Sequence, residues 1–147
     1  MLKKLLITPL LISNIFCAEY EMLAIPQGTP LPVIKQTLSS WEHKEIIREM
    51  CFLGCGLSEL PEEIALFTGL TALSLADNPD LRDKHCQVLQ KLKHLETVHL
   101  NLNEQFFIGA DKTNLCISKI PSLKALSVIA VKQVPLQALN KIDTIVR

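Results

Sequence analysis

A pattern of apolar residues that occurs four times along the chain constrains its fold more than any other feature. In each copy the first, fourth and sixth residues are apolar, and the copies begin at Ile47, Leu70, Leu95 and Leu123. Six residues make one short strand, and the intervals of 23, 25 and 28 residues leave room for a return segment after each strand. Neither segment can bury its apolar side until the next copy stacks on it. The sequence therefore predicts a stack of parallel strands.

The position eight residues after each start supports the same alignment. It is occupied by Cys55, Asn78, Asn103 and Val131. A side-chain amide that turns inward at the end of a strand can donate to and accept from neighbouring turns, which satisfies backbone groups that would otherwise be buried unpaired. A thiol is a weaker donor, and valine has no polar group. We therefore expect Cys55, Asn78 and Asn103 to form an inward structural ladder that ends at Val131.

The segment Gly69–Asn103 shows these features most clearly and resembles the leucine-rich-repeat family. The resemblance covers about residues 46–147. It implies an α/β solenoid, an arc of about four leucine-rich repeats with a short parallel β-sheet on the concave face and a convex side of mixed helical and irregular segments. On the convex side, residues 60–64 resemble the turn of one repeat subtype. Residues 81–95 favour a full amphipathic helix, and residues 105–114 are expected to carry an insertion.

Residues 1–17 have the layout of a signal peptide. Two lysines precede an uncharged apolar run from Leu5 to Phe16, which is well short of the roughly 20 residues that a membrane-spanning helix needs. We expect cleavage after Cys17, so that the mature chain begins at Ala18. The protein is then secreted or extracytoplasmic, in the periplasm or at the cell surface. The alternative is a protein that stays tethered to the membrane by this N-terminal segment.

Residues 18–45 differ from the segments on either side of them. Residues 18–29 carry no periodicity, and three nearby prolines favour an extended segment or a loop. Residues 33–41 then place apolar side chains at helical spacing and end at Trp41. We expect a short N-terminal capping helix that covers the first repeat, because a bare end of such a stack would expose core. The repeat domain itself is expected over residues 46–147.

Charge and aromatic content argue against nucleic acid as a partner. The 15 Lys and Arg residues are balanced by 15 Asp and Glu residues, so there is no basic excess to attract phosphates. Aromatic residues make up only 5% of the chain, which leaves little material for stacking bases. We expect no nucleic-acid partner.

Removal of Cys17 would leave an even number of cysteines, Cys51, Cys55, Cys86 and Cys116. On an extended segment Cys51 and Cys55 lie about 13 Å apart, beyond the limit of about 7 Å for a disulfide. Cys86 and Cys116 occupy comparable places in successive repeats and could approach each other. We favour buried free thiols for this pair.

The outward column of the predicted sheet, Cys51, Ser74, His99 and Ser127, invites a catalytic interpretation. Cys51 and His99 lie two strands apart, about 10 Å, which is too far for activation of a nucleophile. Ser74 and His99 are neighbours, but no carboxylate orients His99, and no glycine-rich turn or helix start provides an oxyanion hole. We expect that the protein is not an enzyme.

Metal and phosphate sites are not expected either. The histidines show no paired metal-ligand spacing, and Cys51 and Cys55 point in opposite directions. The glycine pair Gly54 and Gly56 lacks the Lys-Ser/Thr that follows a phosphate loop. We therefore predict neither a metal nor a cofactor. The histidines are His43, His85, His94 and His99.

Alternate strand residues predict the concave face. If the apolar template points inward, twelve other residues point outward, and of these only Glu49 is charged. A solvated sheet face without a function would normally carry more Lys, Glu and Arg, as the connecting segments 62–63 and 82–84 do. The twelve residues are Glu49, Cys51, Leu53, Ala72, Ser74, Ala76, Thr97, His99, Asn101, Ala125, Ser127 and Ile129.

This face predicts an exported module that binds another protein without catalysis. The alternative is a structural or self-associating envelope component held by an uncleaved N-terminal segment, and the repeat pattern that resumes at Ile142 suggests self-association through an uncapped C-terminal end. A third interpretation is that four strands make too small a concavity to bind anything.

Overall fold

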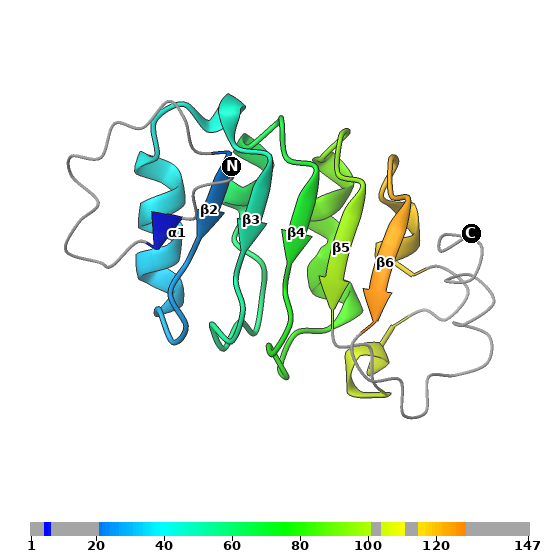
Figure 1. The fold of residues 1–147 in the computed structure, drawn as a ribbon. Helices are drawn as coiled ribbons and strands as arrows, with labels where there is room; N and C mark the ends of the chain where they lie inside the picture. The colour runs from blue at the N-terminus through cyan, green and yellow to red at the C-terminus, as the bar shows by residue number, and fades with distance from the viewer. Residues whose placement is uncertain (1–4, 7–20, 101–103, 111–114, 129–147) are drawn as a thin grey trace.

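The computed structural model describes residues 5–6, 21–100, 104–110 and 115–128. In this part of the chain six parallel strands form one sheet, and their order in the sheet follows their order in the sequence (Figure 1). The strands are β1 (Leu5–Leu6), β2 (Met22–Ala24), β3 (Glu49–Cys51), β4 (Ala72–Ser74), β5 (Thr97–Leu100) and β6 (Ala125–Val128).

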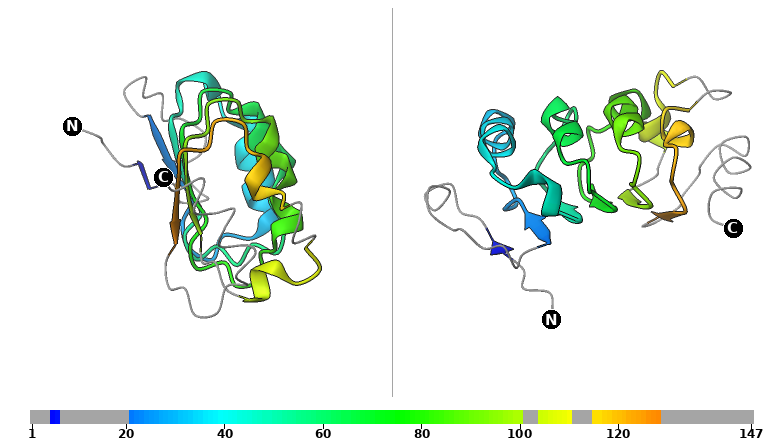
Figure 2. Two further views of the ribbon diagram at one scale, coloured as in Figure 1. Left: turned by 90° about the vertical axis from the view of Figure 1, so that its right-hand side faces the viewer. Right: turned by 90° about the horizontal axis from the view of Figure 1, so that it is seen from above.

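Helical segments make up most of the connections and form a second layer. One is an α-helix and the others are short 3-10 helices. Consecutive members α1, η2, η3 and η5 contact one another, and Figure 2 shows them along one side of the sheet. The described part is therefore an α/β fold with a parallel sheet. The segments are α1 (Leu31–Ser40), η1 (Lys44–Ile46), η2 (Glu62–Leu66), η3 (Asp83–Lys91), η4 (Glu104–Phe107) and η5 (Ile117–Lys119).

The strand register agrees with the alignment of the four sequence copies. Met50 pairs with Leu73, Leu73 with Val98, and Val98 with Leu126. These are the fourth positions of the copies. Parallel strands at these four places are therefore confirmed.

The core lies between the sheet and the helical layer. The nine template positions of the first three copies are all at most 2% exposed, and α1 and η2 contribute further fully buried side chains such as Leu38 and Ile64. Burial of this apolar surface is the main force that holds successive strands together. The nine positions are Ile47, Met50, Phe52, Leu70, Leu73, Leu75, Leu95, Val98 and Leu100.

Strand β2 was not expected, because residues 18–29 show no repeat pattern. Leu23 pairs with Met50 and is fully buried, so the sheet begins one strand earlier than the four copies indicate. A three-residue strand followed by a proline-rich turn is too short for its alternation to be recognised. β1 extends the sheet further, since Leu5 and Leu6 pair with β2. Both residues belong to the predicted signal peptide. The predicted cleavage site after Cys17 lies outside the described residues.

Helix α1 lies where a helix is predicted, although it begins and ends slightly earlier than residues 33–41, and it connects β2 to β3 within the helical layer. Pro32 lies in its first turn, where a missing backbone N–H costs nothing. Ile34 and Leu38 are fully buried. Trp41 follows the helix and packs against the core while remaining partly exposed.

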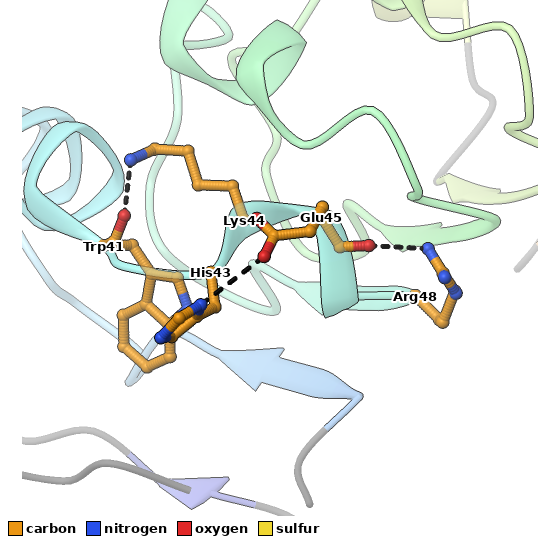
Figure 3. A network of polar contacts seen from close by, with 5 residues as sticks. All are labelled: Trp41, His43, Lys44, Glu45 and Arg48. Carbon is orange, nitrogen blue, oxygen red and sulfur yellow. Dashed lines mark hydrogen bonds and ion pairs between the residues drawn. The ribbon is translucent and has the colours of Figure 1, made fainter. Parts of the chain in front are cut away.

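A network of polar contacts holds the turn after α1 (Figure 3). The Lys44 ammonium donates to the carbonyl oxygens of Ser39 at 3.0 Å and of Trp41, so it caps the helix end. The Arg48 guanidinium donates to the carbonyl oxygen of Glu45 at 2.8 Å and to that of Gly69 at 3.1 Å. Arg48 therefore links this turn to the start of the next strand segment.

The predicted amphipathic α-helix over residues 81–95 is wrong in type and length. The segment is the nine-residue 3-10 helix η3, Asp83–Lys91. Cys86, Leu89 and Leu92 follow one another at steps of three and are at most 1% exposed. A 3-10 helix has three residues per turn, so it places all three on the side that faces the core.

The predicted insertion over residues 105–114 is partly described. It overlaps η4, where the rings of Phe106 and Phe107 meet edge to face with centroids 5.2 Å apart. Both phenylalanines are buried, so this segment adds to the core. Among the described residues there is no helix long and apolar enough to cross a membrane.

Candidate functional site: the open face of the sheet

The outward residues of β3, β4 and β5 alternate with the buried template residues, so they lie on the face of the sheet opposite the core. Figure 2 shows the helical layer along the other side of the sheet. Glu49, Ala72 and Thr97 occupy paired positions in the three strands. Cys51, Ser74 and His99 form a second row. All six are partly exposed, whereas the template residues between them are at most 2% exposed. The burial pattern therefore follows the alternation that the sequence indicates.

Two further residues of the predicted face behave differently from each other. Leu53 is 46% exposed, so it remains available to solvent at the end of the face. Ala76 is only 3% exposed, so it offers little surface to a partner. Its carbonyl oxygen accepts hydrogen bonds from the Gly54 amide at 3.0 Å and from the Asn78 amide group at 3.1 Å. The first bond joins the turn after β3 to the turn after β4, and the second lies within the turn after β4.

The last column of the predicted face is only partly described. Ala125 and Ser127 lie on β6 in register with Thr97 and His99. Asn101 and Ile129 lie outside the described residues.

Strand β2 extends the face in a way that the sequence pattern missed. Met22 pairs with Glu49 and is partly exposed. Ala24 pairs with Cys51 but is only 3% exposed. We define the sheet face by the seven partly exposed residues Met22, Glu49, Cys51, Ala72, Ser74, Thr97 and His99. Figure 1 shows these strands side by side, and no helix of the described part covers this face.

The sheet face carries few charged side chains. Its side chains are mostly small, and Glu49 is its one acidic residue. Ser74 and His99 occupy paired positions, as the sequence predicts. Within the described part of the chain, no three His, Cys, Asp or Glu side chains gather closely enough to hold a metal ion. A partner surface could pack against the small side chains and form hydrogen bonds with the polar ones.

Asn78 lies inward below this face and holds the turns together. It is 6% exposed. Its Oδ1 accepts from the Leu57 amide at 2.9 Å, and its Nδ2 donates to the carbonyl oxygens of Phe52 and Leu75, each at 2.9 Å. These contacts join the turn after β4 to the turn after β3, as expected for a ladder residue.

Cys55 occupies the preceding ladder position with a thiol. Its single S–H has three carbonyl oxygens within reach, that of Pro26 at 3.5 Å and those of Leu53 at 3.8 Å and Ile25 at 3.9 Å. Burial, and secondarily the neighbouring Cys51, raises the pKa of the Cys55 thiol to about 11. The protonated thiol therefore persists at neutral pH and can serve as a donor. The third ladder residue, Asn103, lies outside the described residues.

Asp83 is a buried structural residue that the sequence pattern missed. The sequence pattern places Asp83 among the solvated charges of residues 82–84, yet it is only 2% exposed. Its carboxylate accepts hydrogen bonds from the backbone amides of Cys116 at 2.9 Å and Ile117 at 3.1 Å. The sequence around Asp83 does not indicate that this residue is buried, because the amides that donate to it lie 33 and 34 residues away.

Paired charges join other parts of the described chain rather than the sheet face. Lys35 of α1 forms an ion pair with Glu59 at 2.9 Å, and Lys91 of η3 pairs with Glu62 of η2 at 2.9 Å. Exposed pairs of this kind contribute little stability.

No protein-family model matches the chain, and no curated protein matches it in sequence. The interpretation of the sheet face therefore rests on the residues of this chain.

Proposed function

We propose that the protein is a short leucine-rich-repeat solenoid that binds a protein partner on its sheet face, without catalysis. The observation that carries this proposal is the sheet face itself, whose seven side chains are partly exposed and mostly small.

Three features of the described chain support the solenoid part of the proposal. The parallel strands follow one another in sequence order. Equivalent positions of the sequence copies pair in register, as Ala72 does with Glu49 and Thr97. Asn78 makes the inward hydrogen bonds that a ladder residue requires. Successive units of a solenoid contact mainly their neighbours, and this order of contacts fits that architecture.

The composition of the sheet face supports a protein as the partner. Ala72, Ser74 and Thr97 have short side chains that let another backbone approach closely. Interface centres are depleted in charged residues, and the sheet face fits that composition, because Glu49 is its one acidic residue and it contains no Lys or Arg. The absence of a basic excess in the chain gives no attraction for nucleic acid.

Export is the proposed setting for this binding. It is supported by the N-terminal sequence, in which Lys3 and Lys4 precede an uncharged run, as in a signal peptide. Mass spectrometry of protein recovered from the native cell should find Ala18, or a residue within two positions of it, at the N-terminus. Recovery of intact Met1 in the membrane fraction would contradict cleavage.

The binding experiment compares variants on opposite sides of the molecule. Ala72→Glu and Thr97→Glu each place a charge on the sheet face, and Gln87→Glu places the same charge on an exposed position of η3. A partner should be captured from the native envelope or a host extract by the wild type and by Gln87→Glu. It should be lost from both sheet-face variants, while their melting temperatures stay close to the wild-type value. Capture by all four proteins at equal levels would place binding elsewhere.

A second candidate is a structural or self-associating component that keeps its N-terminal segment. The observation that favours it is the pairing of Leu5 and Leu6 with β2, which makes part of the predicted signal peptide a strand of the sheet. Light scattering of chains that begin at Met1 and at Ala18 distinguishes the candidates. Self-association that requires residues 1–17 supports the second one, and two monomers support the first.

A further inference from the structure

We propose that Cys86 and Cys116 form a reversible disulfide that ties η3 to the segment before η5, by exchange with a small-molecule disulfide such as oxidised glutathione. The described structure shows the reduced form, in which both cysteines are free. This inference is independent of the proposed binding function.

Two side chains of η3 hold Cys116 against that helix. The Asp83 carboxylate accepts from the Cys116 amide at 2.9 Å. The Gln90 side-chain amide donates to the Cys116 carbonyl oxygen at 3.2 Å. Asp83 and Gln90 lie on either side of Cys86 in the sequence of η3. The backbone of Cys116 is therefore fixed alongside the part of η3 that contains Cys86.

Cys86 lies on the side of η3 that faces this contact. Residues three apart in a 3-10 helix lie above one another, so Cys86 follows Asp83 on one side of η3, about 6 Å further along the axis. Cys86 is fully buried in the core, and Cys116 packs against that core. The two thiols are near enough for the charge of one to affect the ionisation of the other.

The exchange balances as two thiol–disulfide steps. Cys116, which is partly exposed, loses its proton to solvent, and its thiolate attacks one sulfur of glutathione disulfide. A mixed disulfide forms, and one glutathione thiolate leaves with the electron pair of the broken bond. Cys86 then loses its proton and attacks the Cys116 sulfur, which releases the second glutathione thiolate. Two protein thiols are oxidised and one glutathione disulfide is reduced to two thiols.

The surroundings of the thiols make this exchange slow at neutral pH. Burial raises the pKa of Cys86 well above its ordinary value, with smaller contributions from Asp83 and Cys116. Burial and Asp83 also raise the pKa of Cys116, and Lys119 partly offsets them. The thiolate is the nucleophile, and below the thiol pKa its fraction rises with pH. The exchange should therefore accelerate roughly tenfold for each unit by which the pH is raised in that range.

Peptide mapping of the full chain tests the pairing directly. Trypsin cleaves after Lys84 and Lys91 and after Lys112 and Lys119, so each cysteine lies in its own short peptide. After incubation with millimolar oxidised glutathione at about pH 8.5 and alkylation of remaining thiols, the two peptides should appear joined, with the mass of two hydrogens lost. Dithiothreitol should separate them again.

Matched variants complete the test. The joined peptide should vanish in Cys116→Ser and persist in Cys51→Ser. Oxidation should raise the melting temperature of the wild type and of Cys51→Ser by roughly 5–10 °C, because the crosslink closes a long loop, and should leave that of Cys116→Ser unchanged. The proposal is overturned if Cys116 carries glutathione while Cys86 stays alkylated, or if both cysteines are alkylated after prolonged incubation.

Discussion

Asn78 Nδ2 donates a 2.9 Å hydrogen bond to the carbonyl oxygen of Phe52, 26 residues earlier in the chain. The same side chain accepts from the Leu57 amide, so one buried amide satisfies backbone groups of the preceding turn. Such groups have no access to water and would otherwise carry the full cost of desolvation. The relationship shows how a single polar side chain stabilises the boundary between two successive strands.

Asn78→Ala should lower the free energy of unfolding by about 3 kcal/mol, because it leaves several buried backbone groups without partners. Asp80→Ala is the matched control: Asp80 is exposed two residues later, and its loss should change stability by less than about 0.5 kcal/mol. Urea denaturation of the two variants measures the difference. Equal midpoints would mean that Asn78 has no ladder role.

Asp83→Ala should also destabilise the protein by about 3 kcal/mol, since it removes the acceptor of the Cys116 and Ile117 amides. Asp83→Asn keeps one acceptor oxygen and should cost less. Hydrogen exchange provides a local readout, in which the amides of residues 116 and 117 lose protection in Asp83→Ala.

Lys84→Ala is the control for this prediction, because Lys84 is the exposed neighbour of Asp83. It should change stability by less than about 0.5 kcal/mol. Unchanged protection of both amides in Asp83→Ala would contradict the role assigned to Asp83.

Gly69→Ala should destabilise the protein by about 2 kcal/mol for steric reasons. A Cβ at this position would lie 1.7 Å from the Arg48 guanidinium and 2.6 Å from the Glu45 carbonyl oxygen. Arg48→Ala removes the first clash and also two hydrogen bonds. The double variant should therefore cost about 1 kcal/mol less than the sum of the single variants. Strict additivity in chemical denaturation would show that Arg48 and Gly69 do not interact.

The stability of the protein should fall on mild acidification because of His85. Its Nδ1 accepts a 3.0 Å hydrogen bond from the Arg82 amide, which requires a neutral ring. Burial, followed by Lys84 and Arg82, lowers the pKa of His85 below 6.5. The unfolded chain therefore binds the proton first, and the contribution of His85 is complete above about pH 6.5 and declines below it.

His85→Gln keeps a side-chain acceptor that does not titrate, so it is the matched variant for this prediction. Between about pH 7.5 and 5.5 the wild type should lose more free energy of unfolding than His85→Gln does. Parallel pH profiles of the two proteins would show that His85 is not the group responsible.

The strands β3 to β6, their register and the position of the ladder residue Asn78 could all be predicted from the sequence. These features depend on apolar residues and one amide that occur at fixed intervals. Each strand buries its apolar positions in the same way, so equivalent positions of successive copies pair with each other. The alternation of inward and outward residues along Glu49–Cys51 and its neighbours follows from the same geometry.

The remaining features could not be predicted from the sequence, because they depend on partners far away along the chain. Strand β2 exists because β3 pairs with it, and its three residues carry no recognisable period. Asp83 is buried because the amides of Cys116 and Ile117, more than 30 residues later, satisfy its charge. A short sequence pattern does not indicate such distant contacts.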